Sequence, residues 1–198
     1  TTPARSVARR SAQTAMFHVA ECFVRWLAPI LSFTAEEVWG YLPGERAESV
    51  FFAEWYAQLP AVTGVENGDW ERTLVVREGV SRELEKLRVA GTIGAGLDAE
   101  VDLYCNGGML ESLARFGDEL RFIFITSRAT ALPAAARTGD AVNVLPDSVW
   151  IRVARSPHAK CVRCWHHRED VGAHAAHPEL CGRCVSNVAG AGESRRFA

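Results

Sequence analysis

The sequence has 198 residues, of which 48% are hydrophobic, and its formal net charge is -2 at pH 7. This length and composition suit one large or two small globular domains and exclude a wholly disordered chain. No apolar run approaches the roughly 18 residues of a membrane helix, and no secretory signal opens the chain, so we expect a cytoplasmic protein without a membrane span.

The chain starts Thr1-Thr2-Pro3, without an initiator methionine and directly before a helical pattern, so we expect a piece of a longer protein. Apolar residues then recur every three or four positions over residues 5–31, which predicts a long amphipathic helix packing on a core. Its expected core-facing residues are Ala12, Met16, Val19, Phe23, Leu27 and Ile30. A second, short helix is predicted over residues 34–41, with Thr34 and Glu37 at the spacing of a capping box.

Two further segments complete the first half of the chain. Residues 50–55 are apolar and are predicted to form an extended connector across the helices. Residues 69–90 carry an apolar stripe with charged residues on the other side, which predicts a third helix, and Gly91 is placed to end it. These elements predict a helical bundle over residues 1–90.

The apolar period changes after Gly91 from that of a helix to the alternation of strands. Three strands are predicted, around residues 97–105, 122–126 and 149–153, with a helix over residues 109–116 between the first two. Residues 129–147, rich in Ala, Pro and Gly, are expected to form a loop.

The predicted fold class is therefore α+β. Residues 1–90 form a helical bundle, residues 91–156 a small three-stranded α+β module, and residues 157–198 a four-cysteine zinc segment. Two isolated thiols, Cys22 and Cys105, lie among apolar neighbours and are expected to be buried and without function.

Four other cysteines form two Cys-x-x-Cys pairs separated by sixteen residues: Cys161, Cys164, Cys181 and Cys184. This spacing is typical of a four-cysteine zinc site, because a two-residue gap lets both thiolates of a pair turn toward one ion. The alternative is a pair of disulfides or redox thiols, which is typical of secreted or redox proteins.

A zinc ion with four protein ligands has no open position for substrate, so we expect one structural ion that contributes folding energy to this short segment. One of five nearby histidines could replace a cysteine as ligand: His158, His166, His167, His174 or His177.

The cysteine-rich end is also the basic end of the chain. Residues 1–150 hold 14 Lys/Arg against 20 Asp/Glu, whereas residues 151–198 hold 8 against 4. Five arginines there are available to an anionic partner: Arg163, Arg168, Arg183, Arg195 and Arg196. Arg163 and Trp165 flank Cys164, so a zinc-held loop could offer a guanidinium and an indole to unpaired bases. Equally, Trp165 could cap the zinc site as a miniature core.

With these residues in view, the chain resembles the C-terminal end of bacterial isoleucyl-tRNA synthetases, which are class I aminoacyl-tRNA synthetases. The resemblance runs essentially from end to end, through "SVARRSAQTA", "LAPILSFTAEEVWGYLPGE", "GDELRFIFITS", "CVRCW" and "LCGRCVSNVAGAGESRRFA". The "LSFTAEEVW" segment alone is similar to the wider Ile, Val and Leu synthetase group, and the terminal four-cysteine finger narrows the resemblance to the isoleucine enzyme.

The resemblance implies that the helical part closes an anticodon-binding domain and that the zinc segment holds the anticodon stem-loop of isoleucine tRNA. It implies that Arg163 and Trp165 approach anticodon bases, and the basic residues Arg183, Arg195 and Arg196 are expected to help. The parent enzyme would use ATP to join isoleucine to its tRNA, as a monomer. The catalytic signatures and the editing domain of the family are missing from these residues, so the fragment alone is expected to be inactive.

Two other functions fit parts of the pattern. DNA glycosylases of the Fpg/Nei type also end in such a finger, but they need an N-terminal catalytic Pro and Glu, which this chain does not offer. A standalone tRNA-binding module is the third possibility, and an intact reading frame ahead of Thr1 would distinguish it from a synthetase.

Overall fold

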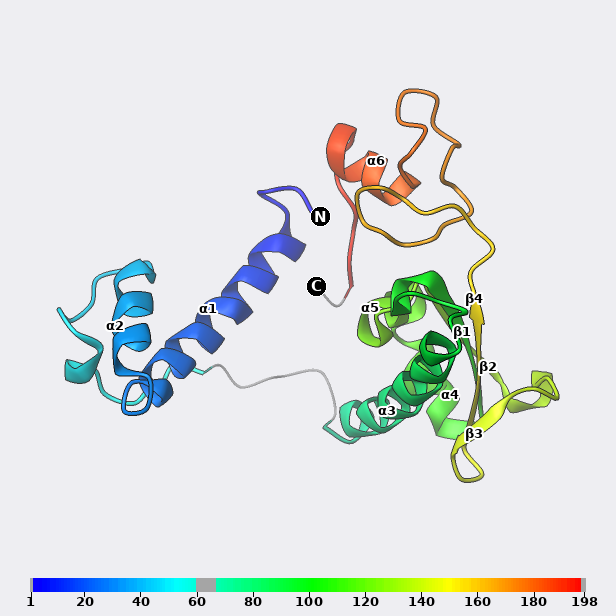
Figure 1. Ribbon diagram of the computed structural model, residues 1–198, viewed down its shortest axis with the longest axis horizontal. Helices are drawn as coiled ribbons and strands as arrows, with labels where there is room; N and C mark the ends of the chain where they lie inside the picture. The colour runs from blue at the N-terminus through cyan, green and yellow to red at the C-terminus, as the bar shows by residue number, and fades with distance from the viewer. Residues whose placement is uncertain (1, 60–66, 197–198) are drawn as a thin grey trace. The chain divides into compact units, whose positions relative to one another are not determined.

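The structure is a computed structural model that describes residues 2–59 and 67–196 (Figure 1). These residues fall into two compact units, one of residues 4–59 and one of residues 67–196 together with residues 2–3. Among the described residues, no helix combines the length and apolar character that crossing a membrane requires.

The first unit is helical. Helix α1 (Val7–Leu27) begins after Ser6, whose side chain accepts a hydrogen bond from the amide of Arg9 at 3.2 Å, as an N-cap does. It ends before Pro29, and helix α2 (Ser32–Tyr41) follows, then the short 3₁₀ helix η1 (Val50–Phe52). The first two predicted helices are thereby confirmed, whereas η1 replaces part of the expected extended connector.

The predicted capping box of Thr34 and Glu37 is wrong. Helix α2 begins at Ser32, so Thr34 already lies in its first turn. The start is set earlier because the amide of Ala35 bonds to the carbonyl of Leu31 at 2.8 Å, and the Ser32 hydroxyl bonds back to the carbonyl of Ala28. The N-cap residue is Leu31, whose side chain makes no hydrogen bond to the first turn, so the helix starts without a side-chain cap.

The core of this unit uses a different side of α1 from the one predicted. The core cluster consists of Val24, Ala28, Ala35, Trp39 and Val50. In contrast, Met16, Phe23 and Ile30 of the predicted stripe are 64%, 52% and 76% exposed. The periodicity was correct for a helix, but the described residues of this unit leave that face uncovered.

The second unit is α+β, with four strands rather than three. Strands β1 (Ala99–Cys105), β2 (Arg128–Pro133), β3 (Val142–Leu145) and β4 (Val149–Arg155) form one sheet in the order β2-β1-β4-β3. β1 pairs in parallel with β2, and the other two pairings are antiparallel. The predicted first and last strands are confirmed, while β3 and all but the first residue of β2 lie within residues predicted to be a loop.

The predicted strand at 122–126 is wrong. Leu120–Phe124 is instead helix α5, which ends at Ile125 with φ of +57°. It follows helix α4 (Gly107–Ala114) and the 3₁₀ helix η3 (Gly117–Glu119), and these turns connect β1 to the parallel strand β2. A parallel pair needs a crossover of a dozen or more residues, and this short apolar run serves as part of it.

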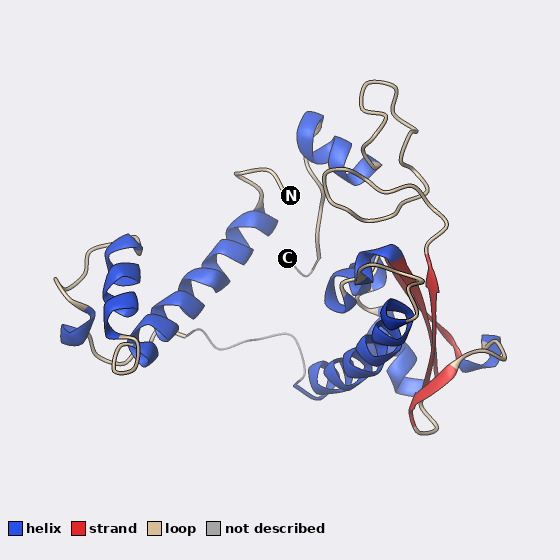
Figure 2. Ribbon diagram, in the orientation of Figure 1, coloured by secondary structure: helices blue, strands red, loops and turns tan. Residues whose placement is uncertain are grey.

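Helix α3 (Asn67–Val89), predicted correctly, packs on this sheet together with α4 and α5 (Figure 2). Gly91, with φ of +71°, ends the helix as expected. Two more 3₁₀ helices lie in this unit, η2 (Gly96–Asp98) and η4 (Ala134–Ala136). The shared core consists of Val76, Val80, Val101, Leu103, Cys105, Met109, Leu113, Leu120, Phe124, Ala129, Val149 and Ile151.

The isolated thiols are both buried and unpaired, as expected. Cys22 lies on α1 and Cys105 at the end of β1, where burial raises the pKa of Cys105 to about 11. Such a thiol is protonated at neutral pH and is therefore a poor nucleophile or ligand.

Candidate metal centre and its surroundings

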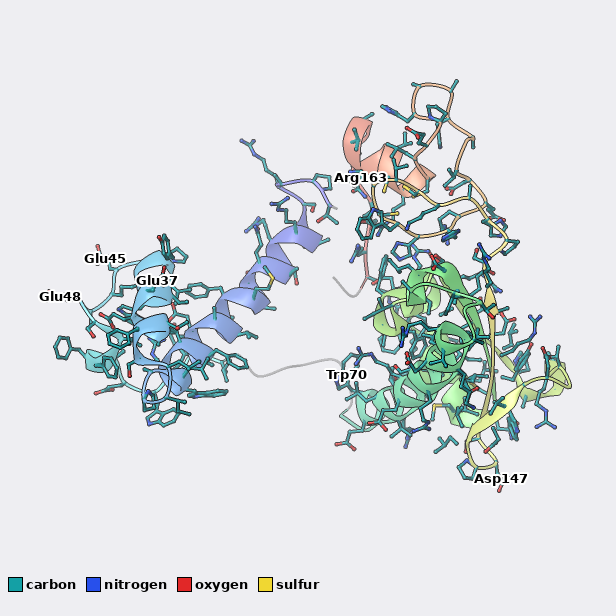
Figure 3. The ribbon with its side chains drawn as sticks, in the orientation of Figure 1. Glu37, Glu45, Glu48, Trp70, Asp147 and Arg163 are labelled. Carbon is teal, nitrogen blue, oxygen red and sulfur yellow. The ribbon has the colours of Figure 1, made fainter. Side chains whose placement is uncertain are left out.

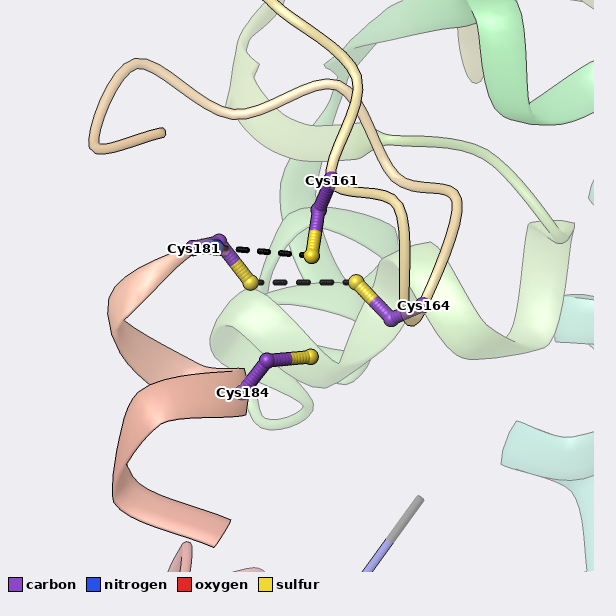
Figure 4. Close-up of side chains that lie close together, drawn as sticks. All are labelled: Cys161, Cys164, Cys181 and Cys184. Carbon is purple, nitrogen blue, oxygen red and sulfur yellow. Dashed lines mark hydrogen bonds between the residues drawn. The ribbon is translucent and has the colours of Figure 1, made fainter. Parts of the chain in front are cut away.

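A tight turn positions the first cysteine pair. The amide of Cys161 donates to the carbonyl of His166 and the amide of Trp165 donates to the carbonyl of Cys161, both at 2.9 Å. Lys160 and His167 form an isolated antiparallel bridge at the mouth of the turn. The chain thus reverses within a few residues and points both sulfurs inward (Figure 4).

Helix α6 (Gly182–Ala189) positions the second pair. Cys181 is its N-cap residue and Cys184 lies in its first turn, so the start of the helix places both sulfurs beside the first pair. A carboxylate oxygen of Asp170 accepts a hydrogen bond from the amide of Gly182 at 2.8 Å and caps the helix.

Gly182 is needed for close approach rather than for an unusual backbone angle. It is not among the residues with positive φ, but a Cβ there would lie 2.8 Å from the Asp170 carboxylate oxygen. The absence of a side chain at Gly182 thus has a steric role in this turn.

The four sulfurs of Cys161, Cys164, Cys181 and Cys184 lie within 4.8 Å of one another. The distance between the Sγ atoms of Cys164 and Cys181 is 3.7 Å, far beyond a disulfide bond, and all four cysteines are free. A tetrahedron with zinc–sulfur bonds of about 2.3 Å has edges of about 3.8 Å. The sulfur cluster therefore has the donor type and spacing of a zinc tetrathiolate.

The four thiols lie close enough to change the pKa values of one another. A hydrogen bond with Cys181 lowers the pKa of Cys164, and the same contact raises the pKa of Cys181. Burial is the main cause of the raised pKa of Cys184. Four thiolates at this spacing need a cation among them, and a bound Zn²⁺ supplies that charge and holds the segment folded.

Arginines surround the cluster. Arg163 Nη1 lies 3.8 Å from the sulfur of Cys184 and donates to it (Figure 3 labels Arg163). Three others, Arg121, Arg168 and Arg183, line one small cavity with Cys164 and Cys181. A zinc tetrathiolate carries a formal charge of roughly -2, which these guanidinium groups offset.

None of the five histidines joins the sulfur cluster among the described residues. His166 is buried and its Nδ1 lies 3.2 Å from the carbonyl of Cys164. His167 fastens the segment to the sheet unit instead: its amide donates to the Ser127 hydroxyl at 2.6 Å, and its Nε2 lies 3.3 Å from the Asp98 carboxylate.

The structure separates the five expected RNA-contacting residues into two groups. Arg163 is exposed and Trp165 is 60% exposed on the first turn, while Arg196 is exposed in the tail. Arg183 and Arg195 both pair with Glu193, at 3.5 and 3.2 Å. Their guanidinium carbons lie 5.1 and 4.2 Å from the centre of the Phe122 ring, so both hold the tail against α5.

One residue of the exposed turn was missed by sequence reasoning. Lys160 is exposed, and its Nζ lies 5.2 Å from the centre of the Trp165 ring. Its position directly before Cys161 was the available signal, because a residue flanking a zinc ligand is held by the same turn.

Family models match two parts of the chain. A model described as an anticodon-binding domain of tRNA ligase matches residues 2–103, and one described as a zinc finger found in FPG and IleRS matches residues 160–187. With the sulfur cluster, the second match identifies a structural zinc site in this segment.

Curated relatives are similar along the whole chain. It is 56% identical over 201 residues to an isoleucine–tRNA ligase of Pseudomonas paraeruginosa and 60% identical over 204 residues to one of Thioalkalivibrio sulfidiphilus, each match covering 100% of this chain. A match to the isoleucine–tRNA ligase of Methylococcus capsulatus is 56% identical and covers 97% of the chain.

The chain spans only about a fifth of the length of these relatives, 21%, 22% and 21% respectively. About half of the chain matches the anticodon-binding model, and its zinc segment matches the zinc-finger model. The first two relatives match the chain over its whole length. The chain therefore belongs to the family of anticodon-binding domains of tRNA ligases and is similar to the C-terminal region of bacterial isoleucyl-tRNA synthetases.

Proposed function

We propose that this chain recognises the anticodon stem-loop of isoleucine tRNA as part of an isoleucine–tRNA ligase. The observation that carries the proposal is the indole of Trp165, 60% exposed on a loop that the zinc cluster holds in place. An exposed aromatic ring on such a loop suits unpaired bases, which stack on aromatic planes with little dependence on sequence.

We further propose that Cys161, Cys164, Cys181 and Cys184 are the four ligands of one structural zinc ion. Support comes from their mutual distances and from the start of α6, which places two of the four sulfurs beside the other pair. The ion closes a loop of sixteen residues between the pairs, in a segment too small to bury a large core of its own.

For the RNA contacts, we propose two roles among the five basic and aromatic residues. Trp165 stacks on a base, and the outward-facing donors of Arg163 and the exposed Arg196 meet phosphates or base edges. Arg183 and Arg195 act from within the protein: their pairing with Glu193 and stacking on Phe122 keep the tail in place.

The enzymatic reaction belongs to the whole protein in this proposal. Isoleucine is joined to its tRNA with ATP in a region that these 198 residues do not include, so this chain alone forms no aminoacyl-adenylate and binds no ATP. We propose a cytoplasmic, monomeric parent. We also propose three functional segments, residues 1–90, 91–156 and 157–198. This division differs from that of the compact units, because α3 lies in the first segment but packs with the sheet.

The test is binding of the zinc-loaded chain to an isoleucine-tRNA anticodon stem-loop. Trp165→Ala should weaken binding by about 1–3 kcal/mol, the loss of one stacked base. Trp70→Ala is the matched control, because it removes a partly exposed indole from α3 (Figure 3). Unchanged affinity of Trp165→Ala with full zinc content would refute base stacking.

Because the zinc finger family also occurs in FPG, duplex DNA is the second arm of the test. We expect the stem-loop to bind more tightly than a DNA duplex of the same length. The opposite preference would favour the glycosylase-type function over the proposed one.

A further inference from the structure

Lys160 lies beside Trp165 on the exposed turn and is not among the RNA contacts proposed above. Lys160 precedes the first cysteine and Trp165 follows the second, so the turn brings them together across the bridge between Lys160 and His167. The ammonium lies 5.2 Å from the indole centre, within the range of a cation–π contact. Both side chains are exposed.

Lys160 differs from its basic neighbours in having a free charge. Arg163 donates to the Cys184 sulfur, Arg183 and Arg195 pair with Glu193, and Arg168 lies 3.7 Å from Asp118. Among residues 2–59 and 67–196, no carboxylate forms an ion pair with Lys160. Its ammonium can therefore bind an anion without breaking an ion pair.

The contact with Lys160 also divides the indole into two unlike faces. A cation over one face occupies it and limits the rotation of the ring, which leaves the opposite face for a stacked base. A base on that face places its own phosphate or that of the next nucleotide close to the ring edge, within reach of the flexible lysine side chain.

We infer that Lys160 is a further RNA-contacting residue of this site, which orients the Trp165 indole and binds a phosphate of the nucleotide stacked on it. The inference rests on the proposed function and adds the ligand that the free cation takes: the backbone of an unpaired RNA segment. A single indole face then accommodates one base.

The chain itself supplies a matched control, because Lys86 and Lys160 are its only lysines. Lys86 lies on α3 and pairs with Glu83 at 2.7 Å. The variants Lys160→Met and Lys86→Met keep an unbranched side chain and remove one charge each. Zinc content is measured for both, so that damage to the metal site is recognised.

Lys160→Met should weaken binding of the anticodon stem-loop by about two- to fivefold at low salt. The slope of log affinity against log salt should become shallower by about 0.7, the value for one phosphate contact to a single strand. Lys86→Met should change neither quantity. Lys160→Arg should restore most of the affinity and the slope, because it restores the cation.

Chemical labelling gives an independent measurement on the protein with its wild-type sequence. An amine-acetylating reagent followed by mass spectrometry reports each lysine separately, and bound stem-loop should protect Lys160 several-fold while leaving Lys86 unchanged. Equal labelling of Lys160 with and without RNA, or a Lys160→Met variant with wild-type affinity and salt slope, would overturn the inference.

The two proposals fail differently. If Trp165→Ala weakens binding but Lys160→Met does not, the inference about Lys160 is wrong and the proposed function stands. If the wild-type chain shows no preference for the stem-loop and neither variant matters, the proposed function itself is wrong.

Discussion

Trp165 has a backbone conformation that disfavours its own side chain. Its φ is +67°, in the left-handed region, where residues with a Cβ atom lose roughly 1–2 kcal/mol relative to the right-handed region. Glycine has no such penalty. The turn that aligns the two sulfurs therefore favours glycine, and tryptophan is kept at a local cost.

The positive φ at Trp165 predicts opposite orders of stability for two pairs of variants, one pair at Trp165 and one at Val162, each replaced by alanine or by glycine. Trp165→Ala and Trp165→Gly both remove the indole, but only glycine relieves the strain. Glycine also loses about 0.4–1 kcal/mol through the greater freedom of the unfolded chain, so Trp165→Gly should be more stable than Trp165→Ala by about 1 kcal/mol. Val162 is 54% exposed and has no positive φ. There, Val162→Gly should be less stable than Val162→Ala by about 0.5–1 kcal/mol.

The assay is urea unfolding of the zinc-loaded chain at one buffered concentration of free zinc, with release of zinc to a chelator as a second readout. Both Trp165 variants should bind the anticodon stem-loop equally weakly, because both lack the indole. If Trp165→Gly is no more stable than Trp165→Ala, while the Val162 pair behaves as expected, the strain at this position does not exist.

Three further predictions concern the metal, the pH dependence and the sheet unit. Removing zinc with a chelator should increase hydrogen exchange in residues 157–196 and leave the core of α3 and the sheet protected; uniform protection after zinc loss would contradict a structural role. Burial raises the pKa of Asp98, but the amides of Ala95 and Gly94 and the contact with His167 outweigh it, so the pKa lies below its usual range. The stability that Asp98 contributes is thus present above the unfolded pKa of about 3.9 and is lost as pH falls through the lower folded value. Asp98→Asn should flatten that part of the stability curve, and an unchanged acid transition would refute this. Gly79→Ala should destabilise the sheet unit by about 1–3 kcal/mol in urea unfolding, since the new Cβ would lie 2.7 Å from the Cβ of Val144, whereas Gly68→Ala on the same helix meets no atom within 4 Å and should be neutral or stabilising.

Local chemistry made much of this protein predictable from sequence. Helix α3 has charged residues opposite an apolar stripe and a glycine after its end, and the alternation in β1 and β4 reflects one buried face of a sheet. The cysteine spacing predicted the zinc site because two residues between ligands suffice to turn both sulfurs the same way. Such features depend on residues close together in the chain.

Short elements were predicted less well. Residues 120–124 are apolar in a run too brief to show a period, and the helical choice comes from the crossover that joins β1 to β2. Strand β3 has four residues and pairs with β4 across a turn in which Asp147 has φ of +52° (Figure 3). Neither strand β2 nor β3 has enough alternation to be recognised without its partner.

The sequence by itself determined the zinc ligand pattern and the long helices, because each depends on spacing along the chain, and the quoted segments carried the family resemblance. Only the tertiary structure decided which cations are free. Arg183 and Arg195 are held by Glu193 and Phe122, while Lys160 stands over Trp165 without a carboxylate partner among the described residues. Charge is a property of composition, but its availability depends on neighbours distant in sequence that folding brings within a few ångströms.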